Sequence, residues 1–203
     1  MIEITQATTE NELDAVRALS HAFTDWLKEL NPDAQGPVNQ YFESLEVELA
    51  SLPGNYGPPA GRLLLAYSSG VVAGTVAMRD IGNHICEMKR MFVYPGFHGQ
   101  GIGRALATTL IGESRKCGYS RMRLETSRGQ VAALGLYRNL GFQEIPPYYD
   151  IPEELRTNMV FMELRLWVDP PPNNSVEPWN HTGPSADPPS CGKWTLALPA
   201  RKT

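Results

Sequence analysis

The chain has 203 residues, enough for one domain or for one domain with a tail, and its apolar share of 42% and charged share of 20% are those of an ordinary globular protein. Its formal net charge of −4 gives no electrostatic reason to expect a nucleic-acid partner. No apolar run approaches the ~20 residues of a membrane helix, so no membrane partner is expected either.

The N-terminus has no basic segment followed by an apolar core, so no secretory signal is expected. The three cysteines are widely spaced, which argues against a disulfide framework and against a CxxC metal site. The four histidines show no metal-ligand spacing. The sequence therefore predicts a cytoplasmic protein without a metal, in which Cys86 and Cys117 are structural.

The first part of the chain predicts one strand and two helices. Residues 2–8, "IEITQAT", alternate like a short strand. Residues 10–30 carry apolar side chains at three-to-four spacings, which predicts an amphipathic helix with Thr8 or Thr9 as its N-cap. Residues 38–52 predict a second helix, and a loop rich in Pro and Gly follows it.

The rest of the chain alternates strands and helices. Residues 62–67 and 71–81 predict a β-hairpin. Further strands are predicted over 84–94, 120–127, 142–145 and 159–166, and helices over 103–118 and 129–141. Antiparallel hairpins before residue 99 and a helix crossover after residue 103 predict a mixed sheet in a layered α/β domain (an α+β arrangement).

The character of the sequence changes after Leu166. Residues 167–203 are rich in proline and show no periodicity, which predicts a disordered tail. We therefore expect one folded domain over residues 1–166.

Three glycines at every second position, Gly99, Gly101 and Gly103, connect the strand over 84–94 to a helix. A dinucleotide-binding fingerprint is one interpretation, with Glu125 about twenty residues further on as the ribose-binding acid. Against it, the G-x-G-x-x-G spacing fails, and the five residues 94–98 stand between Val93 and the first of these glycines.

The strand before the turn also argues against that fingerprint, whose first strand is buried on both faces and reads as continuous apolar residues. Strict alternation instead predicts charged and apolar side chains on both faces, with one face formed by Glu87, Lys89, Met91 and Val93 and the other by Met88, Arg90 and Phe92.

The second interpretation is an anion site at the start of the helix. Glycines let backbone N–H groups close on a ligand without obstruction by a Cβ, and the unpaired amides of the first helical turn favour an anion. The residues of this turn would hold a pyrophosphate, with Arg104 within reach: His98, Gly99, Gln100, Gly101, Ile102 and Gly103.

The segments "EMKRMFVYPGFHGQGIGRAL" and "ALGLYRNLGF" resemble the GNAT superfamily of acyl-coenzyme A-dependent N-acetyltransferases. The phosphate-binding pattern of this family, Gln/Arg-x-x-Gly-x-Gly/Ala, falls on His98, Gly101 and Gly103, and His98 departs from the usual Gln or Arg. The resemblance covers residues 2–166. It implies a mixed, mostly antiparallel sheet flanked by helices, with a V-shaped opening between its fourth and fifth strands.

The resemblance also implies roles for individual residues. Glu87, in mid-strand, is the candidate general base; the other interpretation is an ion pair with Lys89 or Arg90. Tyr137 is the candidate general acid toward the coenzyme A sulfur; the other interpretation is core packing of its helix.

The resemblance further implies a bulge in the strand over 84–94. Backbone groups of Met91, Phe92 and Val93 would then pair with the pantetheine arm. Tyr148 and Tyr149, with Asp150 and the loop over 54–61, are candidates for lining the acceptor site.

The sequence thus predicts an enzyme, an acyltransferase that moves the acetyl group of acetyl-coenzyme A directly to a primary amine, most simply that of a small molecule. Two alternatives stay open: an acetyltransferase for protein amines, and a non-catalytic acyl-coenzyme A-binding module, which would need neither Glu87 nor Tyr137. A homodimer is also left open.

Overall fold

The computed structural model describes residues 1–30, 45–151 and 156–166. The tail expected over 167–203 lies outside the described residues. So do residues 38–44, the first half of the helix expected over 38–52. The described residues 45–50 of that segment are helical.

The N-terminal helix α1 covers Glu10–Leu30, as its apolar spacing predicts. Its start is closed by a capping arrangement in which the Glu12 carboxylate accepts the backbone N–H groups of Thr8 and Thr9, each at 2.9 Å. The Thr9 hydroxyl accepts the backbone N–H of Glu12 at 3.4 Å, which confirms the expected threonine cap, and the returning carboxylate satisfies two N–H groups just before the helix.

Seven strands form one mixed sheet with the order β1-β2-β3-β4-β5-β7-β6. All neighbouring strands pair antiparallel except β4 and β5, which pair parallel. This confirms the mixed, mostly antiparallel sheet. The strands are β1 (Ile2–Gln6), β2 (Arg62–Ser68), β3 (Val71–Asp80), β4 (Ile85–Val93), β5 (Arg121–Ser127), β6 (Gln143–Ile145) and β7 (Met159–Arg165).

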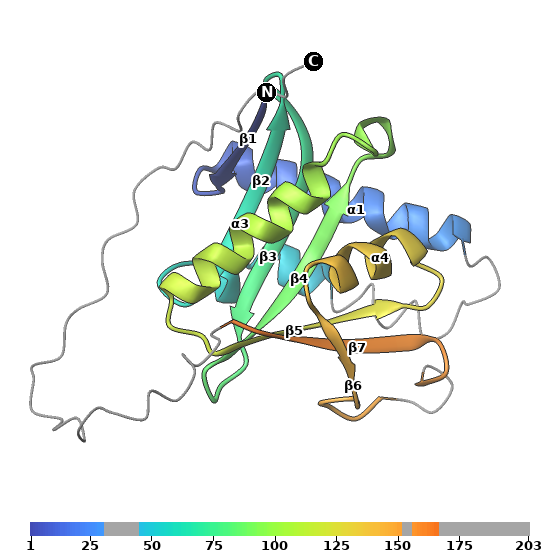
Figure 1. The fold of residues 1–203 in the computed structure, drawn as a ribbon. Helices are drawn as coiled ribbons and strands as arrows, with labels where there is room; N and C mark the ends of the chain where they lie inside the picture. Colours follow the sequence, from blue (N-terminus) through green and yellow to red (C-terminus); the bar gives the residue numbers. More distant parts are fainter. Residues whose placement is uncertain (31–44, 152–155, 167–203) are drawn as a thin grey trace, which may run out of the picture.

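Helices cover both faces of this sheet. Helix α1 lies behind it, and α3 (Ile102–Lys116) and α4 (Val131–Asn139) lie in front (Figure 1). Two apolar clusters result. The larger, between α3, α4 and the sheet, includes Leu106 and Met122, and the smaller, beneath α1, includes Leu19 and Leu65. The parallel pair β4 and β5 lies between the two halves of the sheet, and α3 forms the crossover that a parallel pair requires.

Candidate active site

Strands β4 and β5 pair only over their first residues and then separate. The parallel ladder joins residues 85–87 to residues 121–123, after which β4 runs on to Val93 and β5 to Ser127. Figure 1 shows the two strands diverging beyond this point. Because β3 occupies the other edge of β4, the edge that faces β5 has backbone groups without a strand partner. The expected V-shaped opening is therefore present.

A β-bulge in β4 accompanies this divergence. Thr75 of β3 pairs with Phe92 and Ala77 pairs with Lys89, so Arg90 and Met91 together stand opposite one residue of β3. Arg90 has a φ of +55°, a backbone conformation that bulges accommodate. One extra residue shifts the side-chain alternation of everything that follows it in the strand.

The strict alternation expected from the sequence is therefore wrong beyond Lys89. Met91 and Val93 pack against the cluster beneath α3, the same cluster that contains Met88. Phe92 instead packs against the cluster beneath α1. The side chains of these three residues thus enter the two cores, and only their backbone groups are left for the opening.

The glycine turn follows β4 after one short 3₁₀ turn, Pro95–Phe97. Gly99 and Gly101 have φ values of +77° and +82°, where a side chain would be strained, and a Cβ at either position would meet no atom within 4 Å. Within the described residues, no backbone acceptor takes the N–H groups of residues 99–104. Six consecutive amides at the start of α3 are therefore available to an anion.

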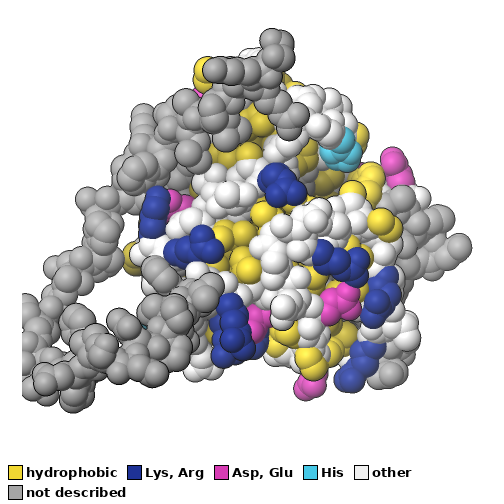
Figure 2. All heavy atoms as spheres, in the orientation of Figure 1, with side chains coloured by type: hydrophobic (Ala, Val, Ile, Leu, Met, Phe, Trp, Pro, Cys, Tyr) yellow, Lys and Arg dark blue, Asp and Glu magenta, His cyan; other side chains and the backbone are white. Residues whose placement is uncertain are grey.

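The imidazole of His98 turns back toward the strand, with Nε2 2.9 Å from the carbonyl oxygen of Val93. This contact links the turn to the end of β4. The structure thus places next to one another the residues expected to bind the coenzyme: 91–93 at the end of β4 and 98–104 in the turn and first helical residues. Basic side chains are spread over the face that carries α3 and α4, rather than gathered in one patch (Figure 2).

Tyr137 lies in α4, which packs close to the start of α3. The Leu136 side chain lies 3.6 Å from where a Cβ on Gly103 would stand. The Tyr137 ring is buried and packs edge-on against Phe142, with 5.7 Å between ring centroids. Burial raises the pKa of Tyr137, so the phenol stays protonated at neutral pH. Among the described residues its hydroxyl has no hydrogen-bond partner, which leaves the proton available to a ligand.

Glu87 is more enclosed than the sequence suggested. Its side chain is 1% exposed, and both carboxylate oxygens have partners on other elements. Nε and Nη2 of Arg79, on β3, lie 2.7 Å from one oxygen, and the Tyr148 hydroxyl donates to the other at 2.7 Å. The expected ion pair with Lys89 or Arg90 is wrong in its partner, because Arg79 fills that place.

The other two charged residues of β4 have partners of their own. Lys89 pairs with Glu125 of β5 at 2.7 Å, which bridges the diverging strands. Arg90, from the bulge, pairs with Glu48 of the helical residues 45–50. Both basic side chains are mostly buried, so they do not form a solvated face of the strand.

Tyr148, which contacts the Glu87 carboxylate, belongs to an aromatic cluster. The rings of Tyr148, Tyr149 and Phe161 form a mutual edge-on cluster with centroids 5.3–5.4 Å apart. The Arg123 guanidinium lies 5.2 Å from the centroid of the Tyr148 ring. Burial and the Glu87 carboxylate raise the pKa of Tyr148, so its hydroxyl remains a donor. Tyr149 donates a hydrogen bond to Glu125.

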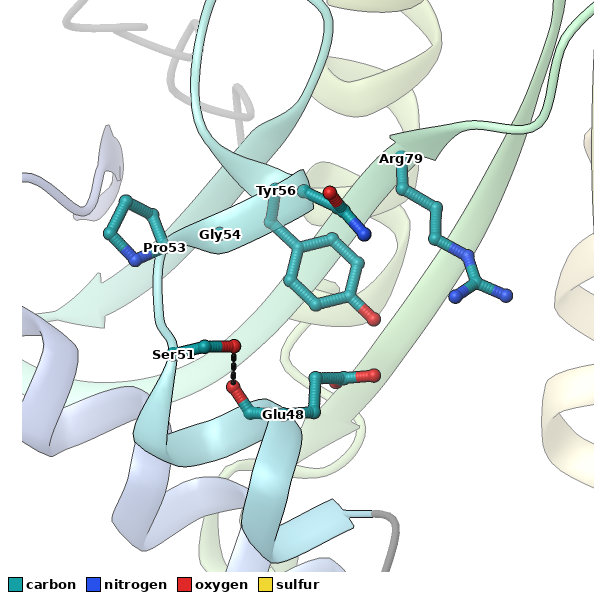
Figure 3. A pocket seen from close by; sticks show the side chains of 7 residues that line it. Glu48, Ser51, Pro53, Gly54, Tyr56 and Arg79 are labelled. Carbon is teal, nitrogen blue, oxygen red and sulfur yellow. Dashed lines mark hydrogen bonds between the residues drawn. The ribbon is translucent and has the colours of Figure 1, made fainter.

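Arg79 also lines a small pocket (Figure 3). The ion-pair partner of Glu87 is therefore part of the wall of this pocket. Part of the loop expected near the acceptor site lines it, but sequence reasoning singled out neither Arg79 nor Glu48. The lining residues are Glu48, Ser51, Pro53, Gly54, Asn55, Tyr56 and Arg79.

The buried thiol of Cys86 has no role in this constellation. Burial raises its pKa to about 12, which keeps it protonated and a poor nucleophile. In the described parts of the chain, no group of three or more His, Cys, Asp or Glu side chains could hold a metal ion. No helix of those parts is long and apolar enough to cross a membrane.

The open β4 edge, the row of free amides and the covered carboxylate together define an enzyme of the acyl-transfer class, and comparison with known proteins agrees. The sequence model of the acetyltransferase (GNAT) family matches residues 21–142, more than half of the chain. The chain therefore belongs to the GNAT family of N-acetyltransferases.

One relative is an uncharacterized N-acetyltransferase of Schizosaccharomyces pombe, 38% identical over 127 residues that cover 62% of this chain and 76% of the relative. Among solved structures, a GNAT-family acetyltransferase of Staphylococcus aureus covers 82% of this chain and 100% of its own, with a TM-score of 0.64 and 20% identity. The PaiA N-acetyltransferase of Thermoplasma acidophilum, solved with coenzyme A, covers 81% of this chain and 99% of its own, with a TM-score of 0.59 and 17% identity. Both structures share the fold.

Proposed function

We propose that the protein transfers the acetyl group of acetyl-coenzyme A directly to the primary amine of a small molecule. The observation that carries this proposal is the set of six free amides at residues 99–104, placed at the end of a strand whose own edge is open. A pyrophosphate complements the amides and the dipole of α3, and an extended amide-bearing arm complements the strand edge. Arg104 is exposed beside the turn and can reach a phosphate.

The coenzyme A that one structural neighbour holds supports this choice of donor. On this assignment, Met91, Phe92 and Val93 act through backbone N–H and C=O groups. A thioester carbonyl that accepts a backbone N–H in this region would be polarised for attack.

We propose that Glu87 takes protons from the amine through Tyr148. Glu87 is too buried for an amine to reach it directly, but the Tyr148 hydroxyl already donates to it. A proton from the ammonium group passes to the Tyr148 oxygen as the phenol proton passes to the Glu87 carboxylate, which leaves a neutral amine and an unchanged tyrosine.

The neutral nitrogen then attacks the thioester carbon and forms a new C–N bond. After the nitrogen loses its second proton, the tetrahedral adduct collapses, the C–S bond breaks and the thiolate leaves. The free hydroxyl of Tyr137 gives its proton to that thiolate and regains one from solvent. The net products are the acetamide, the thiol of coenzyme A and one proton.

The small pocket beside Arg79 supports a small acceptor, because it can hold a polar group of such a molecule beside the ion-pair partner of Glu87. We also propose that residues 1–166 form the catalytic domain and that it works in the cytoplasm. Cys86 is a free thiol, which suits a reducing compartment.

The test is a panel of amines incubated with acetyl-coenzyme A, with release of free thiol as the readout and lysine-containing peptides as a separate arm. We expect release with at least one small amine, and a loss of at least ten-fold in kcat for Tyr137→Phe. Release with peptides alone would favour the protein-amine alternative. Binding of acetyl-coenzyme A without release from any acceptor would refute the catalytic assignment.

A further inference from the structure

The Tyr56 side chain is 2% exposed, yet its hydroxyl makes no hydrogen bond within the described residues. Tyr56 ends the short 3₁₀ turn Gly54–Tyr56, and its ring packs against the cluster beneath α1. The Glu48 carboxylate lies beside the hydroxyl, close enough to help burial raise the pKa of Tyr56, but the two groups make no hydrogen bond of ordinary length. A buried polar group without a partner costs about 1–3 kcal/mol, and folded proteins keep few of them.

This hydroxyl points into the small pocket. Figure 3 shows it directed toward the space between the Glu48 carboxylate and the Arg79 guanidinium. Burial raises the pKa of Tyr56, so the group remains protonated and can donate. The unused donor is therefore offered to whatever occupies the pocket.

Arg79 supplies a second unused donor at the same place. Its Nε and Nη2 are both engaged by one oxygen of Glu87, while Nη1 has no partner within the described residues. The side chain is 36% exposed and lines the pocket. A phenol and a guanidinium on one small space form a set of donors suited to anionic oxygens.

The charges around the pocket balance. Arg90 pairs with Glu48, and Arg79 pairs with Glu87. A ligand with net charge would unbalance this arrangement, whereas in a zwitterion the ammonium group offsets the charge that the carboxylate brings. The cavity volume is about 40 Å³. At ~10–15 Å³ for each water-sized group, it has room for roughly three non-hydrogen atoms, the number in a carboxylate group.

We propose that this pocket binds the carboxylate of the acceptor, and that the acceptor is a small amine of the amino-acid type with the carboxylate and the amine a few bonds apart. This inference rests on the proposed function, because it takes the ligand to be the acetyl acceptor. Arg79 contacts the carboxylate of the ligand on one side and Glu87 on the other, so it sets the distance between the bound carboxylate and the proposed proton relay.

Matched pairs of amines test the proposal. Phenylalanine is compared with phenethylamine, leucine with 3-methylbutylamine, and lysine with cadaverine, with thiol release giving kcat/KM for each. We expect the carboxylated member of at least one pair to be preferred ten-fold or more. Equal values within every pair that is turned over would overturn the proposal.

The variant Tyr56→Phe removes only the unpaired hydroxyl. We expect kcat/KM for the preferred amino acid to fall about 5- to 15-fold, mainly through KM, with no change for its decarboxylated partner. The midpoint of thermal unfolding should stay the same or rise, because a costly buried group is removed. Thr5→Val is the matched control, since Thr5 carries the other buried unpaired hydroxyl and does not line the pocket. An unchanged preference in Tyr56→Phe would contradict the assignment.

A binding measurement separates this inference from the proposed function. The same amino acids and amines are titrated by calorimetry into the protein saturated with coenzyme A, where no turnover occurs. Carboxylate-dependent binding without turnover in the kinetic assay would refute the proposed acetyl transfer but support the carboxylate site. Turnover without carboxylate dependence would support acetyl transfer but refute the carboxylate site. Absence of binding by every amino acid would also overturn the inference.

Discussion

Replacing Tyr148 by phenylalanine removes one hydroxyl and tests the proposed proton relay. The ring contacts with Phe161 and Arg123 remain, so packing changes little. What is lost is a 2.7 Å hydrogen bond to a carboxylate that is 1% exposed. A hydrogen bond to a charged group contributes about 1.5–3 kcal/mol, and an unpaired buried oxygen costs about 1–3 kcal/mol. We therefore expect the free energy of unfolding to fall by about 1–3 kcal/mol.

The expected loss of activity is larger than that stability change implies. Positioned proton transfer contributes about 10²–10⁴-fold, so kcat should fall about 100-fold or more at a temperature where the variant is folded. Tyr149→Phe is the control. Its hydroxyl donates to Glu125, which keeps its ion pair with Lys89, so we expect less than about a three-fold change.

Thiol release under saturating acetyl-coenzyme A measures both variants, and Glu87→Gln completes a double-mutant cycle. If Tyr148 and Glu87 act as one unit, the double variant loses no more activity than Glu87→Gln alone. Wild-type kcat in Tyr148→Phe, or additive losses in the double variant, would refute the relay.

Three further predictions concern the turn, the core and the first helix. Gly101→Ala should weaken acetyl-coenzyme A binding at least ten-fold and lower the free energy of unfolding by about 1 kcal/mol, because the φ of Gly101 is +82°. Gly112→Ala, inside α3 with open space around it, should leave stability unchanged or raise it by up to about 1 kcal/mol. Equal affinities of the two variants for acetyl-coenzyme A by calorimetry would contradict this prediction. Burial alone would raise the pKa of Glu113, but hydrogen bonds from Lys116 and Arg62 outweigh it and lower that pKa. The charged Glu113 therefore stabilises the fold above about pH 4.5, and this stabilisation is lost as pH falls through the pKa of the folded protein. The free energy of unfolding in urea, measured from pH 7 to 3.5, should fall less steeply with pH in Glu113→Gln than in the wild type, and identical slopes would argue against this. Glu12→Gln should cost about 0.5–1 kcal/mol by weakening the cap of α1, measured by thermal unfolding at pH 7, and no change would mean that the cap is dispensable.

Local patterns were enough to predict most of the fold. The apolar spacing of residues 10–30 and the glycines at 99, 101 and 103 act through nearby backbone geometry, and α1 and α3 form where these patterns place them. Tyr137 lies on α4 for the same reason, and its burial follows from the packing of that helix. A strand-turn-helix unit of this kind carries its own signals.

The bulge at Arg90 could not be read from residue types, because no local signal distinguishes it from a regular strand residue. It nevertheless decides which core Met91, Phe92 and Val93 enter. The resemblance to a family implied a bulge, but the alternation applied to the strand ignored it.

The surroundings of Glu87 depend on contacts across long stretches of chain. Tyr148 is 61 residues away in sequence, and Arg79 reaches Glu87 only because β3 and β4 form a hairpin with this register. The pocket is likewise assembled from the segment of residues 48–56 and from β3. Such groupings follow from the whole sheet, and a one-dimensional pattern does not contain them.

The most direct test of the central claim is a calorimetric titration of the full chain with acetyl-coenzyme A, repeated with Gly101→Ala and Gly112→Ala. The account predicts one molecule bound per chain, affinity that falls as salt is raised because a pyrophosphate is held by backbone amides, and weakening only in Gly101→Ala. No binding, or binding that Gly101→Ala leaves unchanged, would contradict the assignment of the glycine turn and of the reaction built on it.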